Sequence, residues 1–160
     1  MKPHPRLLLH PAHLLSFGFG SGLAPVAPGT FGTLAAVPLY WLLNQGSLSL
    51  YLATLVIGAL AGIWLCGYTA RVLGVHDHGA IVWDEVIGYL ITMALAPAGW
   101  AWMAWGFVLF RLFDILKPWP IRWVDRHVGG GLGIMLDDVI AGLMGWLVLQ
   151  GSAWLLAASS

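Results

Sequence analysis

Long apolar runs separated by short polar stretches set the pattern of this chain. No Asp, Glu, Lys or Arg occurs from Leu7 to Ala70, from Val86 to Phe110, or from Val139 to the C-terminus. One uncharged run, residues 48–70, is long enough for a helix to cross the ~30 Å hydrocarbon core of a bilayer. The pattern predicts five hydrophobic helices, over residues 31–44, 48–70, 81–96, 100–116 and 136–157. A short additional helix within residues 1–16 is expected to lie in the membrane interface.

Two of the predicted helices are short for a membrane span. Residues 31–44 and 81–96 fall below the ~20 residues that a spanning helix usually needs. They either thin the bilayer or stay partly submerged. A loop ending in Gly29 and Thr30 is expected before the first helix, and a loop rich in charge and glycine, residues 121–133, before the last.

The charged residues fall on one side of the predicted bundle. Twelve of the fourteen Asp, Glu, Lys and Arg residues lie between Arg71 and Asp138. With five spans, the loops at 71–80 and 117–133 share a side with the N-terminus. The turns on the other side and the C-terminus carry no charge. By the positive-inside rule, the charged side is cytoplasmic.

Composition strengthens the membrane assignment and limits the partners. Hydrophobic residues make up 59% and charged residues 9% of the chain, against about 25% charged in soluble domains. The length fits one domain, residues 1–160, and the expected fold class is an all-α, compact, multi-helix integral membrane bundle. A net charge of zero offers nucleic acid no electrostatic footprint. The oligomeric state is unknown from the sequence.

Five carboxylates are expected at one depth of this bundle. Asp84 and Glu85 begin one predicted helix, Asp114 ends the next, and Asp137 and Asp138 begin the last. Clustered carboxylates in a low dielectric repel one another, and a divalent cation removes the conflict. Oxygen ligands without cysteine favour Mg²⁺. The alternative is that the acids cap helix N-termini, which does not account for two adjacent pairs.

Basic residues and a glycine loop could hold an anion beside this metal. Arg111, Asp114 and Lys117 recur at intervals of three and share a helix face, so Arg111 and Lys117 could clamp a phosphate. The alternative is that they anchor a helix end at the headgroups. Gly29 and Thr30, before a helix, are typical of a generic anion site.

Absent motifs narrow the chemistry further. The chain has no Cys-x5-Arg phosphatase loop, no Asp-x-Asp-x-Thr segment, no nucleotide P-loop and no Gly-x-Ser-x-Gly elbow. Water activated by a metal and attacking a phosphoryl group is the simplest remaining reaction.

Four segments in order carry a resemblance to a known family: residues 18–30, 75–88, 110–121 and 130–142. They resemble the bacterial phosphatidylglycerophosphatase A family, collinearly from about residue 14 to 145. The resemblance implies a Mg²⁺-dependent phosphatase of the bacterial inner membrane. Its substrate would be the lipid phosphatidylglycerophosphate, hydrolysed to phosphatidylglycerol and phosphate.

The predicted site residues follow from this resemblance together with the charge pattern. Metal ligands, or the base that activates water, are Asp84, Glu85, Asp137 and Asp138. Asp114 is either a further ligand or the group that orients Arg111. Arg111, Lys117 and the Gly29–Thr30 loop are expected to hold the phosphate. His76 or Asp77 is the candidate that protonates the leaving glycerol oxygen.

Two other classes of membrane protein also use acidic residues in apolar segments. A CDP-alcohol phosphotransferase would carry acids repeated four apart along one helix, whereas here they form adjacent pairs on different helices. A small cation or proton transporter would carry acids near mid-membrane. Here they cluster at the predicted helix ends.

Overall fold

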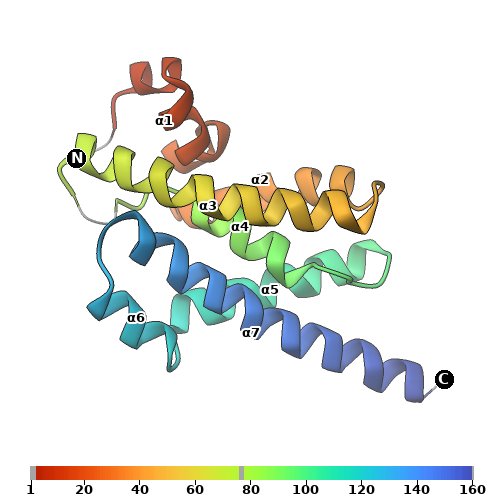
Figure 1. Ribbon diagram of the computed structural model, residues 1–160. Helices are drawn as coiled ribbons and strands as arrows, with labels where there is room; N and C mark the ends of the chain where they lie inside the picture. The colour runs from red at the N-terminus through yellow and green to blue at the C-terminus, as the bar shows by residue number, and fades with distance from the viewer. Residues whose placement is uncertain (1–2, 76–77, 160) are drawn as a thin grey trace.

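The chain folds into a helical bundle with no strand in the part that the structure describes (Figure 1). This computed structural model describes residues 3–75 and 78–159. The five predicted hydrophobic helices are present, with one further helix, α6, and three short N-terminal elements. The elements are η1 Pro5–Leu9, α1 Pro11–Ser16, η2 Gly18–Leu23, α2 Pro28–Leu43, α3 Leu48–Leu73, α4 Trp83–Thr92, α5 Trp100–Leu116, α6 Ile121–His127 and α7 Gly130–Ala158.

Two helices are long and apolar enough to cross a membrane. In the described chain these are α3, with 26 residues, and α7, with 29. Their outward faces carry exposed apolar side chains, among them Ile57 and Leu60 of α3 and Leu147 of α7. Helix α4 has 10 residues, about 15 Å of helix, and is too short to cross a bilayer. The two long helices indicate membrane association.

Helix α7 begins earlier than the pattern predicts. The predicted loop extends over residues 121–133, but α7 starts at Gly130. A Cβ at Gly131 would lie 1.8 Å from the carbonyl oxygen of Ile63 in α3, so this glycine permits close packing of two helices. Asp137 and Asp138 therefore lie inside α7, and the prediction that they begin it is wrong.

Two other helix boundaries differ from the prediction, and one helix is additional. Helix α2 begins at Pro28 after Ala27, which has a left-handed φ of 47°, so Gly29 and Thr30 lie in its first turn. Helix α4 ends at Thr92, four residues early, where the chain turns. The short α6 lies in the expected loop.

Helix α4 is the centre of the bundle and packs against α2, α3, α5 and α7. Its approach to α7 depends on two glycines. A Cβ at Gly142 would lie 2.5 Å from the carbonyl oxygen of Gly88, and one at Gly88 would lie 2.9 Å from that of Asp138. This close contact brings the start of α4 beside Asp138 of α7.

The two ends of the bundle differ in charge, as predicted. The loop after α3, helix α6 and the start of α7 lie at one end, which we call the charged end (Figure 1). The turns at 44–47 and 93–99 and the end of α7 lie at the other, which we call the uncharged end.

Candidate active site

Three carboxylates from two helices meet inside the bundle. Asp84 and Glu85 lie in the first turn of α4, and Asp138 lies on α7. One ligand oxygen from each comes within 4.8 Å of the others. Asp84 and Asp138 are 8% and 3% exposed, and the Glu85 side chain is 13% exposed. We call these three residues the acidic cluster.

Asp138 lies deeper in the bundle than the start of its helix. Asp138 follows the first residue of α7, Gly130, by about 12 Å along the helix axis. Neither acid pair caps a helix: α4 has Val82 at its N-cap position and no side-chain capping bond, and Asp137 lies within α7. The capping alternative therefore does not explain Asp137 and Asp138. Asp84 and Glu85 do lie in the first turn of α4, beside the positive end of its dipole.

Burial and mutual repulsion disfavour ionisation of the acidic cluster. Burial raises the pKa of the Glu85 carboxyl well above its ordinary value, and the neighbouring Asp138 adds to the increase. Glu85 Oε2 and Asp138 Oδ2 are buried and accept no hydrogen bond from the described residues. Buried polar atoms are seldom left in that state, so these oxygens can accept a ligand.

The donor atoms of the acidic cluster suit a hard divalent cation. All three are carboxylate oxygens, the donors that Mg²⁺ and similar ions prefer. A bound cation would be the largest charge in the site and would offset the repulsion. The chemistry of the donors and the two unpartnered oxygens therefore fit a metal site.

Arg111 of α5 is the cation nearest to the acidic cluster among the described residues. Its Nη1 donates a short hydrogen bond to Asp114 Oδ2 and lies 3.9 Å from Glu85 Oε1. Its Nε is buried and has no partner among the described residues. Asp114 thus contacts the guanidinium, while its role as a metal ligand or as the group that orients Arg111 stays a prediction, and Arg111 retains an N–H for an anion.

The first turn of α2 packs against Glu85 and Arg111. A Cβ at Gly29 would lie 2.2 Å from Glu85 Oε1 and 3.0 Å from Arg111 Nη1. Only glycine allows the α2 backbone to approach so closely. Thr30 is half-buried in the same turn, and its N–H donates to the carbonyl of Ala27 at 2.9 Å. The positive end of the α2 dipole therefore faces the acidic cluster and Arg111.

Lys117 lies in a second group of charges, beside the first. Its Nζ donates to Asp125 Oδ1 at 2.6 Å and to Asp137 Oδ2 at 2.7 Å. Burial lowers the pKa of Lys117, but the two hydrogen bonds outweigh burial, and the pKa is raised above its ordinary value. We call Lys117, Asp125 and Asp137 the Lys117 cluster. It connects the end of α5 to α6 and α7.

The predicted site residues therefore fall into two separate groups in the structure. Asp84, Glu85, Asp138, Arg111, Asp114 and Gly29 are brought together. Asp137 and Lys117 face each other instead, so metal binding by Asp137 and phosphate binding by Lys117 stay predictions. His76 and Asp77 lie outside the described residues.

Sequence reasoning missed the residues that assemble the site. Gly88 follows Asp84 by four positions, and Gly142 follows Asp138 by four, so each glycine lies on the same helix face as an acid. Small residues at such positions let helices approach closely, and that spacing was the available signal. Asp125 gave none, because α6 is too short to show a helical period.

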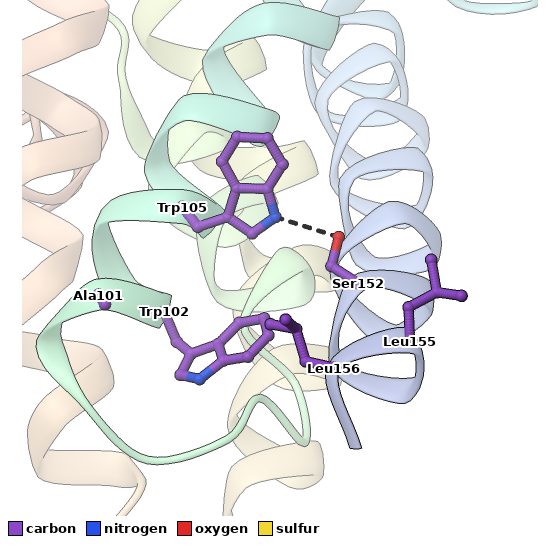
Figure 2. A pocket seen from close by; sticks show the side chains of 6 residues that line it. All are labelled: Ala101, Trp102, Trp105, Ser152, Leu155 and Leu156. Carbon is purple, nitrogen blue, oxygen red and sulfur yellow. Dashed lines mark hydrogen bonds between the residues drawn. The ribbon is translucent and has the colours of Figure 1, made fainter. Parts of the chain in front are cut away.

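One apolar surface hollow lies far from these residues. It has a volume of about 580 Å³ and lies between the start of α5 and the end of α7, at the uncharged end (Figure 2). In this hollow Trp105 Nε1 donates a hydrogen bond to Ser152 Oγ at 3.3 Å. Ser152 lies about 20 Å along α7 from Asp138, so this apolar hollow takes no part in the acidic site.

Comparison with known proteins assigns the chain to a family. The family model described as phosphatidylglycerophosphatase A matches residues 14–153. A phosphatidylglycerophosphatase A of Escherichia coli K12 is 53% identical over 148 residues, covering 91% of this chain and 86% of the relative. One of Haemophilus influenzae is 47% identical over 144 residues, covering 89% and 88%.

A more distant relative has a different name. A Bacteroides thetaiotaomicron protein, provisionally named a phosphatidylinositol-3-phosphatase, is 37% identical over 151 residues, covering 89% of this chain and 94% of its own length. No solved structure matches this chain significantly. The family model and the two nearer relatives span most of the chain, including every residue of the acidic cluster. The chain belongs to the phosphatidylglycerophosphatase A family.

Proposed function

We propose that this chain is a Mg²⁺-dependent phosphatase that hydrolyses phosphatidylglycerophosphate to phosphatidylglycerol and inorganic phosphate. The family and its named relatives support the substrate. The observation that carries the proposal is the acidic cluster beside Arg111, because this arrangement can hold a cation and an anion side by side. Membership of this family also argues against the phosphotransferase and transporter alternatives.

The residues divide into two groups by role. Asp84, Glu85 and Asp138 hold the metal, which when bound polarises the phosphoryl group and offsets its charge. Arg111 binds the phosphate oxygens through its free N–H groups, with Asp114 fixing its orientation. The first turn of α2, at Gly29 and Thr30, adds the positive end of its dipole. The Thr30 N–H itself already donates to the Ala27 carbonyl.

The protonation steps involve residues whose roles stay predictions. A carboxylate of the acidic cluster is the candidate base for the attacking water. His76 or Asp77 is the candidate acid for the leaving glycerol oxygen. Lys117 and Asp137 are assigned a supporting role, because the ion pair between them satisfies both.

The proposed setting is the bacterial inner membrane, with the charged end in the cytoplasm. In this orientation α3 and α7 cross the bilayer. The acidic cluster then lies about two helical turns below the start of α7, within reach of a lipid headgroup. The acyl chains of the substrate would remain in the bilayer.

The test is phosphate release from phosphatidylglycerophosphate by the purified full chain, with Mg²⁺ and with a chelator. Release should require the metal and should fall by at least about 10²-fold in Glu85→Gln and Asp138→Asn, since metal catalysis is worth several kcal/mol. Asp125→Asn is the matched control, since it removes a carboxylate from the Lys117 cluster only.

Three results would sink the proposal: no release, release unaffected by chelation, or equal activity in all three variants. A parallel assay with phosphatidylinositol 3-phosphate measures selectivity. We expect faster release from phosphatidylglycerophosphate.

A further inference from the structure

Helix α6 presents a basic and aromatic hollow that the acidic site does not use. The hollow has a volume of about 340 Å³, and we call it the α6 hollow. Its lining consists of Pro118, Trp119, Arg122, Trp123, Arg126 and His127. It shares no residue with the acidic cluster or with Arg111.

The orientation of α6 is fixed from its inner side. Ile121 and Val124 are 0% and 6% exposed and pack into the bundle. Asp125 is turned toward Lys117 of the Lys117 cluster. The outward face is therefore left to Arg122, Arg126 and the aromatic rings.

The outward face is cationic and its cations are available. No acidic residue lines the α6 hollow, because Asp125, the one acid of α6, pairs with Lys117. Within the described residues neither Arg122 nor Arg126 forms an ion pair. Arg122 makes only a 3.4 Å contact with the carbonyl of Leu116.

Exposed indole rings flank these two guanidinium groups. Trp119 and Trp123 are 80% and 54% exposed. The Trp123 ring stacks on His127, with ring centroids 4.8 Å apart. Exposed tryptophans are costly in water but favoured at the headgroup level of a membrane.

The position of α6 matches that level. It ends three residues before the first residue of α7, one of the two helices able to cross a membrane. In the proposed orientation the α6 hollow lies beside the end of α7 that leaves the bilayer. Arginine binds phosphate groups through two parallel hydrogen bonds, and basic residues beside a membrane helix attract anionic lipids.

We propose that the α6 hollow binds the phosphodiester headgroup of an anionic phospholipid. Arg122 and Arg126 contact the phosphate, and the Trp119 and Trp123 rings lie in the interfacial layer. The inference rests on the charge and placement of α6 and is independent of the catalytic assignment.

The test titrates short-chain lipids into the purified full chain in an uncharged detergent, with native mass spectrometry counting bound molecules. The probes are dihexanoyl-phosphatidylglycerol, dihexanoyl-phosphatidylcholine and inorganic phosphate. Wild type is compared with R122Q/R126Q, with R122K/R126K, and with the control R6Q/R71Q, which removes two exposed arginines at other positions.

We expect R122Q/R126Q to lose binding of the anionic lipid by at least fivefold, while R6Q/R71Q retains it. R122K/R126K should fall between them, because lysine keeps the charge without the paired hydrogen bonds. Phosphatidylglycerol bound in the acidic site as a product would persist in R122Q/R126Q, so the lost binding belongs to α6.

Three outcomes would overturn the inference. An equal loss in R6Q/R71Q would mean general charge attraction. Equal binding of phosphatidylcholine would remove the selectivity for anionic lipid, and competition by inorganic phosphate at the same concentration would indicate a free-phosphate site. Thermal unfolding of each variant separates all of these from misfolding.

Discussion

Asp137 and Asp138 are adjacent in α7 and lie in different electrostatic surroundings. Asp137 accepts a 2.7 Å hydrogen bond from Lys117, whose charge Asp125 shares. Asp138 points at two other carboxylates and keeps one oxygen without a partner among the described residues. Consecutive helical residues are about 100° apart around the axis, which places the two side chains in different environments.

The comparison separates charges that are satisfied from charges that require a ligand. In the Lys117 cluster the half-buried Lys117 ammonium donates to both carboxylates, so each of them has a cationic partner. In the acidic cluster three carboxylates face each other, and Arg111 is engaged by Asp114. Mutual repulsion among buried carboxylates is costly, so a proton or a bound cation stabilises the acidic cluster.

The largest expected effect tests this difference directly. Asp138→Asn should reduce phosphate release by at least about 10²-fold, since it removes a proposed metal ligand. Asp137→Asn should reduce it by less than about tenfold, because that side chain supports the fold through Lys117. Initial rates for both variants at saturating Mg²⁺ measure the contrast. Equal losses would mean that the two aspartates share one role.

A second prediction concerns the contact between α2 and the acidic cluster. Gly29→Ala places a methyl group 2.2 Å from Glu85 Oε1 and must displace either that carboxylate or α2. We expect a loss of roughly tenfold or more in phosphate release, because small displacements of reacting groups are expensive. Gly151→Ala, which meets nothing within 4 Å in α7, is the control and should keep full activity. Wild-type activity in Gly29→Ala would show that the contact between α2 and Glu85 is not needed for phosphate release.

Metal removal should lower the thermal stability only of proteins whose acidic cluster is intact. A ligand present at 100 times its dissociation constant stabilises a protein by about 2.7 kcal/mol, so Mg²⁺ should raise the melting temperature of the wild type. The increase should be much smaller in Asp138→Asn and unchanged in Asp125→Asn. Thermal unfolding in detergent, with Mg²⁺ or with chelator, provides the measurement. The same increase in all three proteins would place the ion elsewhere.

The sequence pattern identified the helices and most of the acidic group. Residues 48–70 and 100–116 correspond closely to α3 and α5, because an uncharged apolar run of this length has few other structures available. The sequence predicts a metal site from Asp84, Glu85, Asp137 and Asp138 because repulsion among buried acids must be relieved, and the structure brings three of these four together.

The rest depended on tertiary contacts that a pattern does not contain. Gly131 is compatible both with a flexible loop and with a tight helix crossing, and only the neighbouring Ile63 carbonyl decides between them. Asp137 and Asp138 look equivalent in the sequence, and the position of Lys117 relative to α7 separates them. The length of α6 was too small to reveal its period.

The smallest predicted effect decides the role of Lys117. Lys117→Met leaves Asp137, which is 5% exposed, without its ammonium partner. Because an uncompensated charge that is largely buried is destabilising, we expect a loss of about 1–3 kcal/mol in the free energy of unfolding, the usual cost of an unsatisfied buried group. The double variant Lys117→Met/Asp137→Asn should recover part of that loss, since it removes the uncompensated carboxylate. Arg6→Met, at an exposed position, is the control for loss of one positive charge. Lys117→Met could instead keep wild-type stability and lose phosphate release as severely as Asp138→Asn. That result would mean that Lys117 binds the phosphate and exchanges its ion pair with Asp137 for the substrate.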